Sequence, residues 1–158
     1  MTGRTPGRAR RLVATLPDDE RGVAVIEAAL MLPLLLGFAF AAVDTSNFLA
    51  QTHRVEQGLS AAGSYLSKAP APETLTARAA NIAATGSPSG SGGARVPGWN
   101  AGDVSITFRT ASGDFRTGDT GRVVVLSTLH TYEGFGFLSA LSGGRVRIRA
   151  SHEERVKA

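Results

Sequence analysis

A single acid interrupts the longest apolar run of this 158-residue chain. The run extends from Gly22 to Val43 as GVAVIEAALMLPLLLGFAFAAV, and Glu27 is its only charged residue. A carboxylate inside a bilayer is costly unless it is paired or protonated, so an intramembrane acid is interpreted as functional by default. Glu27 is therefore the first candidate for a residue with a chemical role.

Other chemistry finds little support in the sequence. The three histidines (His53, His130 and His152) lack the spacing of metal ligands, and the chain has no cysteine. No serine lies in a GxSxG motif, and the SPSGSGG segment does not join a strand to a helix as a phosphate-binding loop would. We therefore expect no catalytic residue, no metal and no cofactor, and no enzymatic activity, small-molecule substrate or nucleic-acid partner.

The apolar run is long enough to cross a membrane. Residues 23–43 as a helix measure about 31 Å, which matches the hydrocarbon thickness of a bilayer. Five arginines precede the run, at positions 4, 8, 10, 11 and 21, so the positive-inside rule predicts a cytoplasmic N-terminus and an exoplasmic C-terminal part. Without cysteines, the exported part has no disulfides and is held by packing or by partners.

Residues from Arg21 to Tyr65 resemble the TadE-like pilus assembly proteins, pseudopilins of the tight-adherence (Flp) pilus system. The resemblance lies in the glycine at position 22, the glutamate five residues later, the VIEAALMLPLLL core and the exit at Asp44. It implies that a prepilin peptidase cuts between Gly22 and Val23. It also implies that Glu27 pairs with the freed amino group of Val23 on a neighbouring subunit, or serves peptidase recognition or membrane extraction. The implied partners are the peptidase, other pilins and the inner-membrane assembly platform.

Two other interpretations of the apolar run remain open. An uncut signal anchor would leave residues 1–22 attached, as a basic leader of a single-pass envelope protein whose exoplasmic domain binds a ligand or cell-wall component. Alternatively, Ala39-Phe40-Ala41 offers the small-x-small pattern of a secretory cleavage site, which would release a soluble product starting at Ala42. A secretory segment has no use for Glu27, and the helical pattern continues past Ala41.

The helix is expected to continue beyond the membrane, through residues 44–68. Pro33 removes one backbone hydrogen bond in its apolar half and favours a kink there. After Asp44, apolar and small residues recur at intervals of three and four, which is the spacing of one helical face. This packing stripe consists of Phe48, Thr52, Val55, Leu59, Ala62 and Leu66.

The C-terminal half reads as a small antiparallel sheet. Residues 69–103 are expected to form a short helix to about Thr85 and a Gly/Ser/Pro-rich loop, which Trp99 anchors to the core. Residues 104–151 are expected to form three strands. Period-two alternation marks 104–109 and 145–150, whereas 122–131 is apolar on both faces at its start and is therefore the expected central strand. A long hairpin loop is expected at 110–121, a glycine-interrupted helical turn packed on the sheet at 134–141, and a polar tail at 152–158. In the third stretch, Arg145, Arg147 and Arg149 share one strand face. This face is either a docking surface, for acidic residues of a partner or for lipid headgroups, or a solvated edge.

The expected fold class is α+β. Three strands cannot bury a core alone, so the packing stripe must lie across them. A long N-terminal helix, transmembrane in its first half and amphipathic in its second, packed on a small antiparallel sheet is also the pilin-like plan. The expected protein is a minor pilin of the bacterial inner membrane that acts in assembly or initiation of a Flp-type pilus, with its C-terminal domain in the periplasm.

Overall fold

The computed structural model describes residues 20–111 and 121–156, and the chain divides into two units, Met1–Ala39 and Phe40–Ala158. Helix α1, Glu20–Ser67, contributes to both units. It begins three residues before the expected start at Val23. The expected hairpin loop falls between the first two strands, and its residues 112–120 lie outside the described part, as do residues 1–19 of the leader.

The described part of the first unit is an apolar helical segment. Its large hydrophobic side chains are exposed. Val23, near the start of the run, is 67% exposed, and Phe38, near its end, is 66% exposed. A helix that is apolar on all sides needs an apolar surrounding. Within the described residues, α1 is the one helix that is long and apolar enough to cross a membrane. Pro33 lies inside α1, and the expected kink there stays a prediction.

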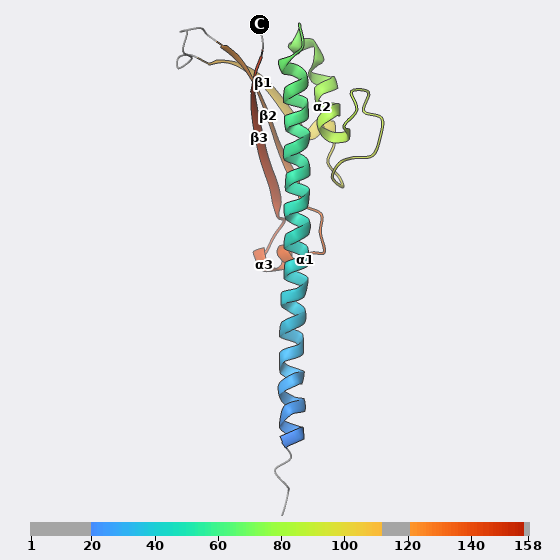
Figure 1. Ribbon diagram of the computed structural model, residues 1–158, viewed down its shortest axis with the longest axis vertical. Coiled ribbons are helices and arrows are strands. Elements are labelled where there is room, and N and C mark those ends of the chain that lie inside the picture. Colours follow the sequence, from blue (N-terminus) through green and yellow to red (C-terminus); the bar gives the residue numbers. More distant parts are fainter. Residues whose placement is uncertain (1–19, 112–120, 157–158) are drawn as a thin grey trace, which may run out of the picture. The chain divides into compact units, whose positions relative to one another are not determined.

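The second unit holds a three-stranded antiparallel sheet (Figure 1). Its strands are β1 (Val104–Ala111), β2 (Gly121–Thr131) and β3 (Arg147–Arg155), with β2 in the centre. Leu126 pairs with Ile106 on one side and with His152 on the other, so these three side chains share one face. The α+β class, with a long helix on a small antiparallel sheet, is thereby confirmed.

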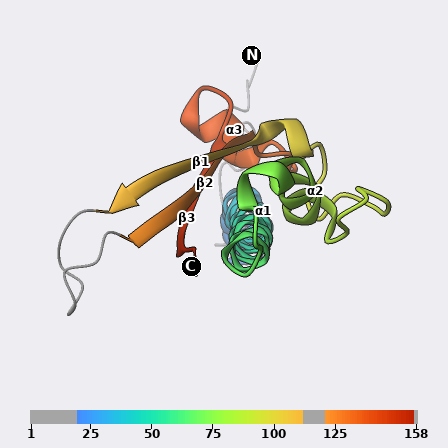
Figure 2. The same cartoon turned by 90° about the horizontal axis from the view of Figure 1, so that it is seen from above.

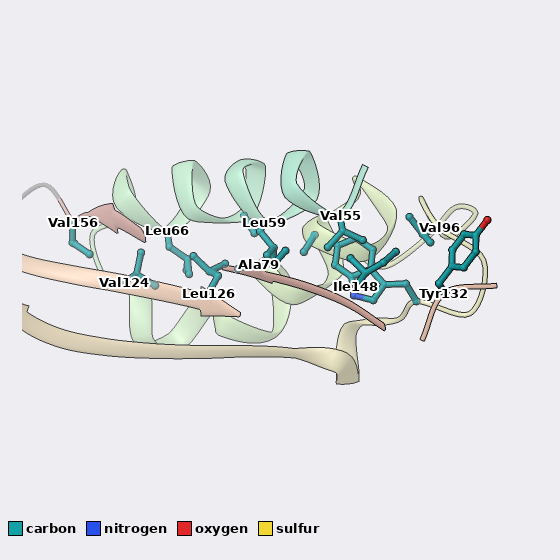
Figure 3. Close-up of a cluster of buried hydrophobic side chains, with 14 residues drawn as sticks. Val55, Leu59, Leu66, Ala79, Val96, Val124, Leu126, Tyr132, Ile148 and Val156 are labelled. Atoms are coloured by element: carbon teal, nitrogen blue, oxygen red, sulfur yellow. The ribbon is translucent and has the colours of Figure 1, made fainter. Parts of the chain in front are cut away.

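The core lies between α1 and one face of the sheet (Figures 2 and 3). Val55, Leu59, Ala62 and Leu66 of the packing stripe are fully buried, whereas Phe48 is half-buried. They pack with side chains of the sheet that include Val124, Leu126 and Ile148. The 4-3-4 spacing on the helix and the alternation on the strands thus bury two apolar faces against each other.

A second, shorter helix closes the same side of the core. The segment expected to be one helix starts as a 3₁₀ turn, η1 (Pro72–Leu75), and continues as α2 (Thr76–Thr85). The buried face of α2 consists of alanines, including Ala79 and Ala83. Small side chains let the helices approach closely, and α1 presents Gly58 at this point: a Cβ there would overlap the carbonyl oxygen of Ala83.

The Gly/Ser/Pro-rich segment is attached to the core through Trp99. Trp99 is buried and its Nε1–H donates to Thr128 Oγ1 at 3.1 Å, which confirms that this side chain anchors the segment. The turn η2 (Ala101–Asp103) then leads into β1. It is held by a capping box: Asn100 Oδ1 accepts a hydrogen bond from the Gly102 N–H at 2.9 Å, and Asp103 Oδ2 accepts one from the Asn100 N–H at 3.0 Å.

The expected polar tail at 152–158 is wrong in its first part, because β3 continues to Arg155. The third strand also begins at Arg147 rather than Arg145. The physical reason is the length of β2, whose residues down to Val123 pair with β3 up to Arg155. Backbone pairing with a long central strand therefore makes a strand of a polar segment that has no apolar alternation of its own.

Candidate functional site

The candidate processing segment lies near the start of α1. Gly22, Val23 and Glu27 are all exposed and helical. Val23 and Glu27 are four residues apart, so they lie on the same side of the helix, about 6 Å apart along its axis. An amino group created at Val23 would therefore be generated on the helix face that carries the carboxylate.

The bond between Gly22 and Val23 lies inside the first turn of α1. The first backbone N–H groups of a helix have no intrahelical acceptor, and glycine is a poor helix former. This turn therefore opens at lower cost than the interior of α1, and opening is needed before a protease can reach the bond.

A second site, which the sequence did not reveal as one, surrounds Asp44. Asp44 follows the last apolar residue of the run, Val43, and is fully buried in the second unit. Its Oδ1 accepts hydrogen bonds from the Tyr132 hydroxyl at 2.5 Å and from the Phe135 N–H at 3.1 Å. Its Oδ2 accepts one from the Leu138 N–H at 2.8 Å. We call these four residues the Asp44 site.

The Asp44 site fastens α1 to the segment after β2. Leu138 lies in the first turn of helix α3 (Phe137–Ser142), so Asp44 satisfies a donor that has no partner within that helix. Phe48 packs edge-on against Tyr132 with ring centroids 5.3 Å apart. One turn further, Gln51 Nε2 donates to the Glu133 carbonyl oxygen at 2.9 Å. Residues 44, 48 and 51 thus form one polar and aromatic stripe on α1.

The electrostatics of the site favour a charged Asp44 beside a neutral Tyr132. The hydrogen bond from the Leu138 N–H, followed by that from Tyr132, lowers the pKa of Asp44 below its ordinary value. Burial, and then the hydrogen bond to Asp44, raises the pKa of Tyr132 to about 12. The pair therefore persists as carboxylate and phenol across the neutral range.

A glycine makes the close approach possible. A Cβ on Gly134 would overlap both the Tyr132 hydroxyl and Asp44 Oδ1. The next glycine, Gly136, directly precedes α3 and has a φ of +87°, a left-handed conformation that residues other than glycine rarely adopt. The glycines of the segment GFGFLSAL therefore serve the Asp44 site. The expected helical turn is the short helix α3, and the first turn of α3 is bound by Asp44 of α1.

The three candidate docking arginines do not share one strand. Arg147 and Arg149 pair with Thr131 and Leu129 and are exposed on the sheet face opposite α1, whereas Arg145 lies two residues before β3. On the same open face, Arg109 of β1 forms an ion pair with Glu153 of β3. The face thus carries both signs of charge, and its use as a docking surface stays a prediction.

The histidines lie apart. His53 contacts Glu56, and His152 contacts Glu154, each within its own element. His130 is buried, and its Nε2–H donates to the Pro97 carbonyl oxygen at 3.0 Å. Among residues 20–111 and 121–156, no group of three or more His, Cys, Asp or Glu side chains is arranged to hold a metal ion.

Comparison with known proteins covers the N-terminal part of the chain. No curated protein and no solved structure gives a significant match. A family model does match, and its matched region starts at Gly22 and includes Glu27, Asp44 and most of the packing stripe. The resemblance read from the sequence is thereby confirmed, because residues 22–63 match the family described as TadE-like protein.

Proposed function

We propose that this chain is a membrane-anchored minor pilin, or pseudopilin, that a prepilin peptidase cuts between Gly22 and Val23. At a coarser level, the TadE-like match indicates a protein associated with the Tad pilus. The observation that carries the finer proposal is where this match begins, at the glycine that precedes the proposed cut. The role is structural rather than enzymatic: the protein acts in assembly or initiation of a Flp-type pilus, with other pilins and the inner-membrane platform as partners.

The orientation follows from charge. The arginine-bearing leader stays in the cytoplasm, α1 crosses the inner membrane, and the second unit lies on the periplasmic side. The candidate span and the exposed apolar side chains of residues 23–43 support insertion of α1. In this arrangement the scissile bond faces the cytoplasm.

Glu27 provides the specificity of assembly. Cutting creates an amino group on Val23, and its attraction to a carboxylate offsets part of the cost of placing either charge in lipid. A neighbouring subunit that packs out of register leaves both charges unpaired. Because Val23 and Glu27 of one chain share a helix face, pairing within the chain competes with pairing between chains.

Replacing the acid tests this mechanism. We expect Glu27→Ala to insert into the membrane but to fail in pilus assembly, whereas the control Glu56→Ala, another exposed α1 acid outside the apolar run, assembles normally. If the Glu27→Ala product is cut but not assembled, the acid acts between subunits. An uncut product would instead assign it to peptidase recognition, and normal piliation would remove the role altogether.

A second candidate is an uncut single-pass envelope protein whose exoplasmic domain binds a ligand or cell-wall component. The position of Gly22 and Val23 inside α1 favours it, because the helix must unwind around a peptide bond before a protease can bind that bond. The mass of the mature protein distinguishes the two, since only the first candidate loses residues 1–22.

A further inference from the structure

The segment around α3 exposes two large apolar side chains. Phe135 is 75% exposed and Leu141 is 71% exposed, close to the 74% of Leu30 in the apolar half of α1. Elsewhere in the second unit beyond Val43, the large exposed hydrophobic side chains of the described residues, Leu49 and Leu129, reach only 51% and 48%. No residue from 134 to 144 is charged. We call these residues the α3 segment.

The Asp44 site fixes the level of the α3 segment along α1. Asp44 is the residue next to Val43, where the apolar run ends, and it binds the backbone N–H groups of Phe135 and Leu138. The segment is therefore tied to α1 at the point where a membrane-inserted helix leaves the hydrocarbon. Phe40 and Val43, on the last turn of the run, are exposed at the same end of the second unit.

We propose that the α3 segment is a second membrane contact, in which Phe135 and Leu141 enter the interfacial layer of the bilayer that α1 crosses. Aromatic and leucine side chains are favoured at this boundary, and each gains by leaving water. Arg145 follows the segment and is exposed, so its guanidinium can reach phospholipid headgroups while its stem covers apolar surface. This inference rests on the insertion of α1 into the membrane, which the proposed function also requires.

A lipid surface fits this patch better than a second copy of the chain. Two large side chains bury on the order of 300–400 Å², which is well below the roughly 800 Å² per partner of a stable protein interface. A bilayer contact needs no such area, because α1 already holds the segment at the membrane and the contact is effectively intramolecular.

Site-directed spin labelling of the full chain tests the proposal, because the chain has no cysteine of its own. Phe135→Cys and Leu141→Cys carry the test labels. Leu35→Cys marks the apolar run. Thr107→Cys marks exposed sheet surface. Thr107 pairs with Val125 of β2, which precedes Tyr132 by seven residues, roughly 23 Å of extended chain. Emission of Trp99, the single tryptophan, verifies that each labelled variant is folded.

The readout is the accessibility of each label to oxygen, which partitions into lipid, relative to a water-soluble nickel complex, in vesicles of mixed zwitterionic and anionic phospholipids. We expect the oxygen-to-nickel ratio at 135 and 141 to be severalfold higher than at 107 and lower than at 35. If the ratios at 135 and 141 equal the ratio at 107 while the label at 35 is in lipid, the second membrane contact, or anchor, is refuted and the insertion of α1 still holds.

Two further outcomes would also overturn the anchor. Spectral broadening at 135 that disappears on dilution with unlabelled protein, without oxygen preference, would show that a second copy covers the patch. A water-accessible label at 35 would refute insertion of α1, and with it both the anchor and the proposed function.

Discussion

Replacing Gly58 by alanine gives a prediction whose sign depends on the packing of α1 against α2. In an exposed helix interior, Gly→Ala stabilises by about 0.5–1 kcal/mol. Here the added Cβ would overlap the carbonyl oxygen of Ala83 and lie 2.8 Å and 3.0 Å from two ring carbons of Trp99. Overpacking of this kind costs typically about 1–3 kcal/mol, and a backbone oxygen cannot rotate away. We therefore expect a net loss of about 1–2 kcal/mol.

Thermal unfolding followed by Trp99 emission measures this change directly, because the indole is buried beside the substituted position. At roughly 4 °C per kcal/mol for a domain of this size, the melting temperature should fall by about 4–8 °C. The matched control is Gly37→Ala in the apolar half of α1, where a Cβ meets no atom within 4 Å, and it should not lower the melting temperature. A Gly58→Ala protein that melts at or above the wild-type temperature would refute the close contact of α1 with α2.

Three further predictions use the same unfolding assay. Gly134→Ala should lower the melting temperature because its Cβ displaces Tyr132 from Asp44, whereas Gly144→Ala, with open space around the new Cβ, should not. The lowered pKa of Asp44 means that the carboxylate stabilises the fold above the unfolded pKa of about 3.9, and this stabilisation is lost as pH falls through the folded pKa. Asp44→Asn removes this titration, so the free energy of unfolding of the variant should fall less steeply below about pH 4 than that of the wild type. Leu59→Ala should cost about 2–5 kcal/mol, whereas the half-exposed Leu49 should tolerate alanine within about 0.5 kcal/mol. Equal effects within either matched pair, or parallel acid profiles, would contradict the corresponding contact.

The elements that periodicity defines could be predicted from the sequence. The 4-3-4 spacing from Val55 to Leu66 specifies a helix with one buried face, and the alternation from Val104 to Phe108 specifies a strand. Both are local patterns, and the α+β plan followed from them. The central position of β2 followed from a third local feature, the apolar residues on both faces at its start. The end of β3 was missed because Ser151–Arg155 is polar throughout, and its strand conformation comes from pairing with β2.

The Asp44 site could not be predicted, because its partners lie far away in sequence. Tyr132 is 88 residues and Leu138 is 94 residues from Asp44, and no local pattern joins them. A lone acid at the end of an apolar run looks like an ordinary exit from the membrane. The role of Gly134 could not be predicted either. Only the three-dimensional contact shows that its missing side chain leaves room for the Tyr132 hydroxyl and the Asp44 carboxylate.

The mature N-terminus tests the central claim most directly. Intact-mass analysis and N-terminal sequencing of the protein isolated from membranes of cells that contain a prepilin peptidase, and from cells that lack it, would give the site of cutting. The account predicts a chain that begins at Val23 in the first case and retains residues 1–22 in the second. A protein that keeps its arginine-bearing leader in both cells, or that begins at Ala42, would contradict it.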